Sequence, residues 1–245
     1  KTKKNIEKKN QFNIALVYWY TTTQELNDPY YYSIRHSIEN ECLEKNINLL
    51  NIYLDNYKDI KSLNVDGIIA LGKYSQEVIN ELSNICENIV IVDYYIDDYN
   101  TDVVVTDLKK ATIDIIDYFI NQEIKHIGFI SGIEKTFDGK VVVDPRLTTY
   151  KEEMIKRKLF NERLIKLGEF TADSGYELMK EIIKEVSLQS AYIVGSDSIA
   201  IGCLKALNEY KIKVPDTVKI FSYNNTSFSQ FTIPALSTVE MNTYI

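Results

Sequence analysis

Short apolar runs alternate with amphipathic stretches along this chain. Residues 12–19 (FNIALVYW), 88–93 (NIVIVD) and 126–132 (HIGFISG) are almost continuously apolar, which is typical of strands covered on both faces. By the same criterion we predict further strands at residues 47–54, 65–72, 103–106, 164–170, 191–195 and 218–223.

Helices are predicted between these strands. Asp28 and Pro29 fit the N-cap and first position of one helix. Ser196 and Asp197 fall in the first turn of another, and the remaining helices are expected at residues 75–82, 107–121, 145–159 and 173–186. This alternation predicts an α/β fold with mostly parallel sheets. Similar strand–loop–helix series begin near residues 12 and 126, which favours two doubly wound halves with a cleft between them.

Composition narrows the class of protein. The 245 residues are 45% hydrophobic, enough to bury a substantial core. No apolar run reaches the roughly 18 residues of a membrane helix, so we expect no membrane partner. Three widely spaced cysteines favour a reducing, cytoplasmic location. The two histidines offer little material for a zinc or histidine-based catalytic centre, so we expect no metal.

The charge is unevenly distributed. The net charge is −7, yet residues 1–10 carry five Lys and one Glu, so the remainder sums to −11. An acidic body repels phosphate backbones and should not bind nucleic acid by itself. The basic start is expected to be a flexible linker.

Candidate binding residues follow the strands, because ligands of open α/β sheets sit beyond the carboxyl ends of the strands. Carboxylates, amides, an arginine and aromatic rings together suit a neutral polyhydroxylated ligand. Each residue alone also fits a structural role, such as a helix cap for Asp197 or a core position for Phe170. Their convergence favours a site built from Trp19, Tyr20, Gly72, Lys73, Asp93, Asp144, Arg146, Phe170, Ser196, Asp197, Asn224 and Asn225.

Enzymatic interpretations find less support. The glycine signatures of dinucleotide-binding, P-loop and serine-hydrolase proteins do not occur in the sequence. A carboxylate pair for glycoside hydrolysis could be sought among Asp93, Asp107, Asp144 and Asp197, but no spacing singles one out. We therefore expect no catalytic residues and no cofactor.

After residue 11 the sequence resembles the effector-binding core of the lactose/galactose repressor family of bacterial transcription regulators. The resemblance rests on the ordered series VDGIIALG, GSDSIAIG, VPDTVKIFSYNN and IPALSTV. NDPYY-x-x-IRH and SGYEL are most similar to repressors of β-galactoside operons. The resemblance implies a periplasmic-binding-protein-like type I fold, with one lobe at residues 12–105 plus 240–245 and the other at 106–239.

The resemblance also implies roles for individual residues. Asp93 would receive sugar hydroxyls, Arg146 would clamp vicinal hydroxyls and Phe170 would stack on the ring. The further expected ligand contacts are Pro29, Tyr32, Lys73, Ser196, Asp197 and Asn224. Several positions depart from the family pattern: Thr149 replaces a Gly, Asn224 an Asp, Ser196 an Asn and Met241 a polar residue. These departures prevent a direct transfer of sugar identity.

The function implied is that of a sugar-responsive transcriptional repressor that forms a homodimer. Galactose or a β-galactoside is the first expected effector, and operator DNA would be bound by a helix-turn-helix domain that is absent from this chain. Residues 1–11 would be a remnant of the linker to that domain, and the closing strand–helix segment of the first lobe would be missing. An extracytoplasmic sugar-binding protein of a transporter is the alternative, and a hydrolase with two cleft carboxylates a weaker third.

Overall fold

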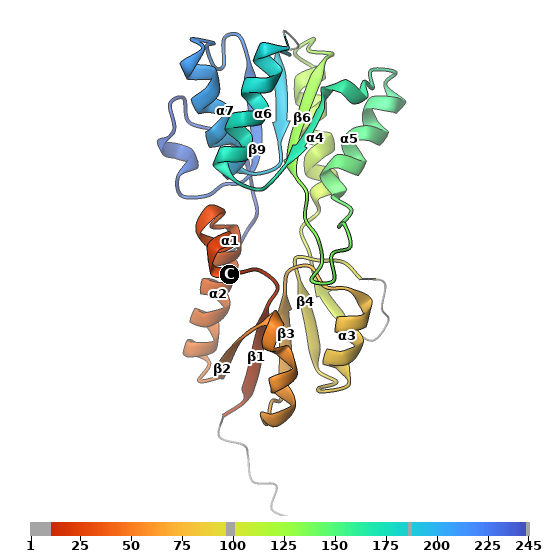
Figure 1. Cartoon of the computed structure of the whole chain (residues 1–245), viewed down its shortest axis with the longest axis vertical. Helices are drawn as coiled ribbons and strands as arrows, with labels where there is room; N and C mark the ends of the chain where they lie inside the picture. Colours follow the sequence, from red (N-terminus) through yellow and green to blue (C-terminus); the bar gives the residue numbers. More distant parts are fainter. Residues whose placement is uncertain (1–10, 97–100, 186–187, 244–245) are drawn as a thin grey trace, which may run out of the picture.

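Two lobes form the molecule, each built around a parallel five-stranded sheet (Figure 1). The computed structural model describes residues 11–96, 101–185 and 188–243, so the predicted linker at residues 1–10 lies outside the described residues, as do residues 244–245. The strand orders are β2-β1-β3-β4-β5 and β10-β9-β8-β6-β7, and all neighbouring strands run parallel. The predicted fold class is confirmed.

Helices cover both faces of the first sheet. Alternate side chains of the first strand enter opposite cores: Ala15 and Val17 pack with the third helix, whereas Leu16 and Tyr18 pack with the second. This two-sided burial explains the continuous apolar run. The elements of this lobe are β1 (Asn13–Tyr18), α1 (Thr22–Asn27), α2 (Tyr30–Glu44), β2 (Asn48–Tyr53), η1 (Leu54–Ser62), β3 (Gly67–Leu71), α3 (Gln76–Ser83), β4 (Ile89–Val92) and β5 (Asp102–Val104).

The second lobe repeats this arrangement. In its first strand Phe129 packs with Ile116 and Tyr150 on one face, and Ile130 packs with Met179 on the other. Its elements are α4 (Leu108–Ile120), β6 (Ile127–Gly132), α5 (Pro145–Lys156), η2 (Glu162–Leu164), β7 (Ile165–Gly168), α6 (Ala172–Lys184), β8 (Ala191–Val194), α7 (Asp197–Glu209), β9 (Lys219–Asn224), η3 (Ser229–Phe231) and β10 (Ser237–Glu240).

Three details correct the sequence analysis. Helix α1, whose N-terminus is capped by a capping box between Thr21 and Gln24, was not predicted. Strand β10 was also missed, because only its pairing with β9 makes this half-buried segment a strand. Its last residue, Glu240, pairs with Asn224 of β9. Helix α2 begins at Tyr30, whose backbone N–H donates to Asp28 Oδ1 at 3.2 Å.

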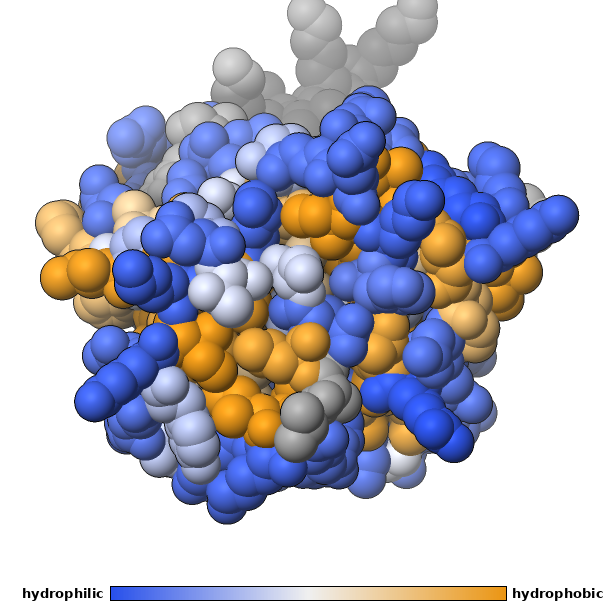
Figure 2. Space-filling model, turned by 90° about the horizontal axis from the view of Figure 1, so that it is seen from above, coloured by the Kyte–Doolittle hydropathy of each residue, from blue (hydrophilic) through white to orange (hydrophobic). Residues whose placement is uncertain are grey.

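The outer surface is mixed in character. None of the helices within the described ranges combines the length and the apolar character that a membrane span needs. Seen from above, the end of the molecule shows hydrophobic residues among many hydrophilic ones (Figure 2). Large apolar side chains are exposed on both lobes, among them Tyr95 on the first and Phe231 and Ile233 on the second.

Candidate ligand-binding cleft

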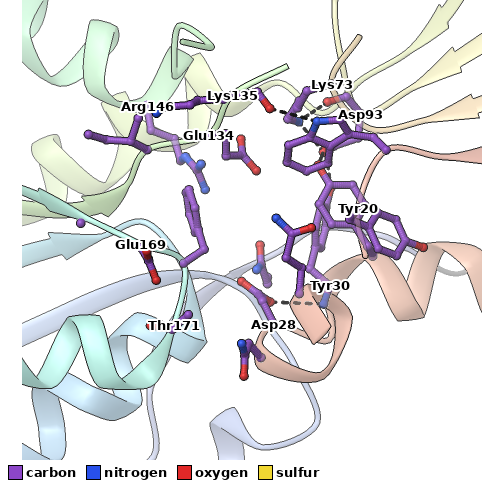
Figure 3. Close-up of a pocket in the computed structure, with 18 of the residues that line it drawn as sticks. Tyr20, Asp28, Tyr30, Lys73, Asp93, Glu134, Lys135, Arg146, Glu169 and Thr171 are labelled. Carbon is purple, nitrogen blue, oxygen red and sulfur yellow. Dashed lines mark hydrogen bonds and ion pairs between the residues drawn. The ribbon is translucent and has the colours of Figure 1, made fainter. Parts of the chain in front are cut away.

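A cavity of about 570 Å³ lies between the two lobes, within the usual size range of small-molecule sites. Residues after β3 and β4 line it from the first lobe, and residues at or after the ends of β6, β7 and β9 line it from the second. Both sheets therefore direct their carboxyl ends towards the cavity (Figure 3). The lining consists of Trp19, Tyr20, Gln24, Asn27, Asp28, Tyr30, Tyr31, Lys73, Asp93, Leu108, Ile133, Glu134, Lys135, Arg146, Gly168, Glu169, Phe170, Thr171, Asn224 and Met241.

Aromatic rings form much of the wall on the first lobe. Tyr20 and Tyr31 stack at 4.7 Å between ring centroids, and Trp19 lies 5.6 Å from Tyr31. Because β1 ends at Tyr18 and α2 begins at Tyr30, these rings meet at the edge where the strand ends and the helix starts. Such a wall offers flat faces to the C–H side of a ligand.

Asp93 stands at the centre of a hydrogen-bonded group. Its Oδ1 accepts from the Tyr30 hydroxyl at 2.8 Å, and its Oδ2 accepts from the Tyr31 hydroxyl at 2.7 Å and from Lys73 Nζ at 2.6 Å. Burial would lower the pKa of Lys73, but the Asp93 and Glu134 carboxylates outweigh burial and raise it. Asp93 has a φ of 68°, a left-handed conformation that Asp tolerates better than most residues. The predicted residues Asp93 and Lys73 therefore share the cavity.

Arg146 is held in place at the start of α5. Its Nε donates to Asp144 Oδ1 at 2.9 Å, and its Nη1 donates to the carbonyl of Gly195. Burial would raise the pKa of Asp144, but the Arg146 charge and hydrogen bonds hold it below its usual range. The guanidinium lies over the rings of Phe170 (5.2 Å) and Tyr223 (5.5 Å). Among the described residues no acceptor takes a hydrogen bond from Nη2, which is thus free to contact a ligand.

Phe170 and Asn224 complete the predicted residues that reach the cavity. The Phe170 ring packs so closely on Gly132 that a Cβ added there would lie 2.2 Å from Phe170 Cδ2. Asn224, the last residue of β9, has a φ of 105°. Unfavourable backbone conformations of this kind cluster at functional sites.

Two predicted residues, Ser196 and Asp197, hold the scaffold instead of lining the cavity. Asp197 is fully buried and accepts hydrogen bonds from Ser222 Oγ, Thr238 Oγ1 and the backbone N–H of Thr226. It thereby joins α7 to β9 and β10. Ser196 is the N-cap of α7 and accepts from the Ile199 N–H at 3.4 Å. The structure thus gives both residues internal roles, and their contacts with a ligand stay a prediction.

Pro29 and Tyr32 are also outside the cavity lining. Pro29 is the N-cap of α2. Tyr32 is 47% exposed and stacks on His36 along the outer side of the same helix. Successive helical residues point about 100° apart, so Tyr30 and Tyr31 turn towards the cavity while Tyr32 turns away.

Asp28 and Glu134 are cavity residues that the sequence analysis did not place in the site. Burial raises the pKa of Asp28 to about 6, against the lowering effect of hydrogen bonds from the Tyr30 backbone and the Ser196 hydroxyl. Glu134 stands two residues beyond Gly132, the end of β6. That strand end was the signal available for Glu134, but the candidates predicted after this strand were Asp144 and Arg146.

Comparison with known proteins gives the chain its family. The regulator GalR of Streptococcus thermophilus is 35% identical over 241 residues, which cover 98% of this chain and 72% of that protein. This chain belongs to the lactose/galactose repressor family of transcription regulators. The repressor MelR of Bacillus subtilis is 33% identical over 228 residues, covering 90% of the chain and 65% of that protein. A profile of the periplasmic-binding-protein-like domain matches residues 116–244.

Solved structures show the same fold for this family core. A regulator of the family from Lactobacillus casei, with bound sucrose, superposes with a TM-score of 0.80 at 22% identity, covering 94% of this chain and 86% of that one. The regulator CcpA of Lactococcus lactis superposes with a TM-score of 0.77 at 22% identity, covering 96% of this chain and 86% of that one. The relatives are transcription regulators and not enzymes, which supports the repressor interpretation over the transporter alternative.

Proposed function

We propose that this core senses a neutral sugar, with galactose or a β-galactoside as the first candidate, and transmits its binding to operator DNA. The observation that carries the proposal is the cavity between the lobes, where Arg146 presents free N–H donors above the ring of Phe170. Hydroxyl groups and the C–H face of a sugar would meet these two partners together. GalR and MelR among the relatives, and the sucrose in the structure from L. casei, support a saccharide.

Signal transmission would be a shift between two lobe arrangements. A ligand that contacts both lobes binds better when they lie close together, and only this difference in affinity moves the equilibrium. Coupling free energies of about 1–3 kcal/mol are usual for such devices. The DNA-binding step would belong to a helix-turn-helix domain, which we place in the full-length regulator.

We further propose that the core acts as a homodimer. Phe231 and Ile233 are 76% and 95% exposed on the second lobe, and exposed apolar groups favour association. Sedimentation velocity at micromolar concentration should give about twice the mass of the 28.4 kDa chain. A monomer at these concentrations would argue against the dimer.

A thermal-shift screen tests the sugar proposal. The ligands are galactose, lactose, allolactose, glucose, ribose and purine nucleobases, and we expect stabilisation by galactose or a β-galactoside. At a ligand concentration of 100 Kd the stabilisation is about 2.7 kcal/mol, which corresponds to about 5–11 °C in Tm for a protein of this size. Stabilisation by a nucleobase and by none of the sugars would refute the proposal.

A further inference from the structure

The segment that joins β6 to α5 crosses from the second lobe to the first (Figure 1). It folds back on itself through an antiparallel bridge between Lys135 and Val141. The indole Nε1 of Trp19, on the first lobe, donates to the Lys135 carbonyl at 3.0 Å. Lys140 Nζ contacts both carboxylate oxygens of Glu77 on α3, at 3.1 and 3.0 Å. Residues 133–143 therefore form a strap, anchored on the first lobe, that closes one side of the cavity.

This strap carries Glu134 into the cavity. Trp19 holds the neighbouring Lys135 carbonyl, and the Glu134 side chain points into the same space as Arg146 (Figure 3). Within the described ranges, no hydrogen bond or ion pair engages the Glu134 carboxylate. Burial raises its pKa, while the charges of Lys73 and Arg146 act in the opposite direction. An acidic group in this position has free acceptors for a ligand.

Two of the three cations that line the cavity, Lys73 and Arg146, are already paired with other carboxylates. Lys73 lies 2.6 Å from Asp93 Oδ2, and Arg146 lies 2.9 Å from Asp144 Oδ1. The lining as a whole carries three cationic and four acidic side chains. Among the described lining residues Lys135 is the one further cation, against three further acidic side chains, Asp28, Glu134 and Glu169. A ligand with its own negative charge would therefore meet an excess of acidic groups, and like charges in a partly dehydrated site repel strongly.

We propose that Glu134 is a specificity-determining residue, which accepts hydroxyl donors of an uncharged sugar and rejects phosphorylated or carboxylated sugars. This inference rests on the proposed sugar-binding function and names the class of sugar. The strap positions Glu134 for this role, because its anchors to Trp19 and Glu77 keep the carboxylate over the cavity.

Titration calorimetry on Glu134→Gln and the wild type tests the inference. The probes are galactose and glucose, each compared with its 6-phosphate and its uronic acid. The control is Glu152→Gln, which removes the same charge from an exposed position on α5. We expect the wild type and the control to prefer the neutral sugar. Glu134→Gln should bind the neutral sugar about 10-fold or more weakly, since a hydrogen bond to a charged group is lost. The ratio of its affinity for the neutral sugar to its affinity for the anionic derivative should fall by about 10-fold or more.

The outcomes separate this inference from the function on which it rests. A wild type that binds a neutral sugar, with an unchanged affinity and preference in Glu134→Gln, would overturn the role of Glu134 and leave the sugar sensor intact. A wild type that prefers a 6-phosphate or a uronic acid would overturn the role of Glu134 and the neutral class of the proposed sugar, while sugar binding itself would stand. A wild type that binds none of these sugars would overturn the sugar-binding function itself, and the role of Glu134 with it.

Discussion

The substitution Arg146→Ala tests the centre of the cleft most directly, because Arg146 serves the scaffold and the ligand together. Its Nε holds Asp144 at 2.9 Å, and the Asp144 side chain is only 13% exposed. Removing one partner of a buried ion pair typically costs about 3–5 kcal/mol. Loss of the Arg146 side chain would open Asp144 towards the adjoining cavity and let water solvate it, so we expect the lower end of this range, about 3 kcal/mol. With the usual stability of about 5–15 kcal/mol the variant stays folded, and its Tm falls by about 6–12 °C.

The pH dependence of this loss identifies its source. Arg146 holds the pKa of Asp144 below its usual range in the wild type, so the stability from Asp144 is present above the unfolded pKa of about 3.9 and is lost only at lower pH. Without Arg146, burial raises that pKa, and Asp144 takes up a proton as the pH falls. The difference in unfolding free energy between wild type and variant should therefore be largest at pH 7 and smaller at pH 4.5.

Urea unfolding at the two pH values measures this difference. Arg163→Ala, on the exposed turn η2, is the matched control and should lie within about 0.5 kcal/mol of wild type. A loss for Arg146→Ala that is equal at both pH values would refute the ion-pair explanation.

Ligand binding gives a second result from the same variant. If the affinity falls about 100-fold, a ligand at 100 times the wild-type Kd stabilises the variant by about 0.4 kcal/mol instead of about 2.7 kcal/mol. Thermal shift with the sugar that stabilises the wild type measures this change. Full stabilisation of the variant would remove Arg146 from the binding site.

Four further substitutions probe neighbouring positions. Phe170→Ala should weaken sugar binding by about 1–3 kcal/mol in calorimetry. An unchanged affinity would show that this ring packs in the core and does not contact the sugar. Gly132→Ala should also weaken it, because the new Cβ would displace Phe170; normal affinity would show that the ring can move freely. Asp28→Asn should raise stability at pH 7 by about 1–3 kcal/mol. Because the folded-state pKa is about 6, the unfolding free energy of the wild type should fall as the pH rises from 4 to 6, and that of Asp28→Asn should not. A difference between the two proteins that stays constant over this range in urea unfolding would contradict this. Asp197→Ala should cost about 3 kcal/mol or more, since it strands buried donors; wild-type stability would contradict its structural role.

The strands were predictable because their burial is local in origin. The run before Trp19 is apolar at every position, and β1 buries alternate residues in two different cores. Strand β10 lacks such a run, since its four residues are half-buried or exposed. Only the partner strand β9 supplies its hydrogen bonds, and no local pattern records that partner.

The site was predictable where a residue lies at the carboxyl end of a strand or within two residues beyond it. Lys73, Asp93, Phe170 and Asn224 reached the cavity on this rule. Asp197 obeyed the same rule and yet turned inward, because three donors on β9, its following loop and β10 satisfy its carboxylate. A strand end therefore brings a residue to the correct edge, while its neighbours decide whether it faces ligand or scaffold.

The sequence by itself determined the alternating α/β architecture, its two halves and the family, because apolar periodicity and short ordered motifs are local properties of the chain. The tertiary structure decided which of the candidate side chains share the cleft and which other residues join them. Tyr30 and Tyr31 line the cavity in place of the predicted Tyr32 because of their positions around helix α2. Glu134 lines it because the strap that carries it is hydrogen-bonded to Trp19 on the first lobe. The contact between Trp19 and Lys135 joins residues 116 positions apart, and it exists only once both lobes have folded and met.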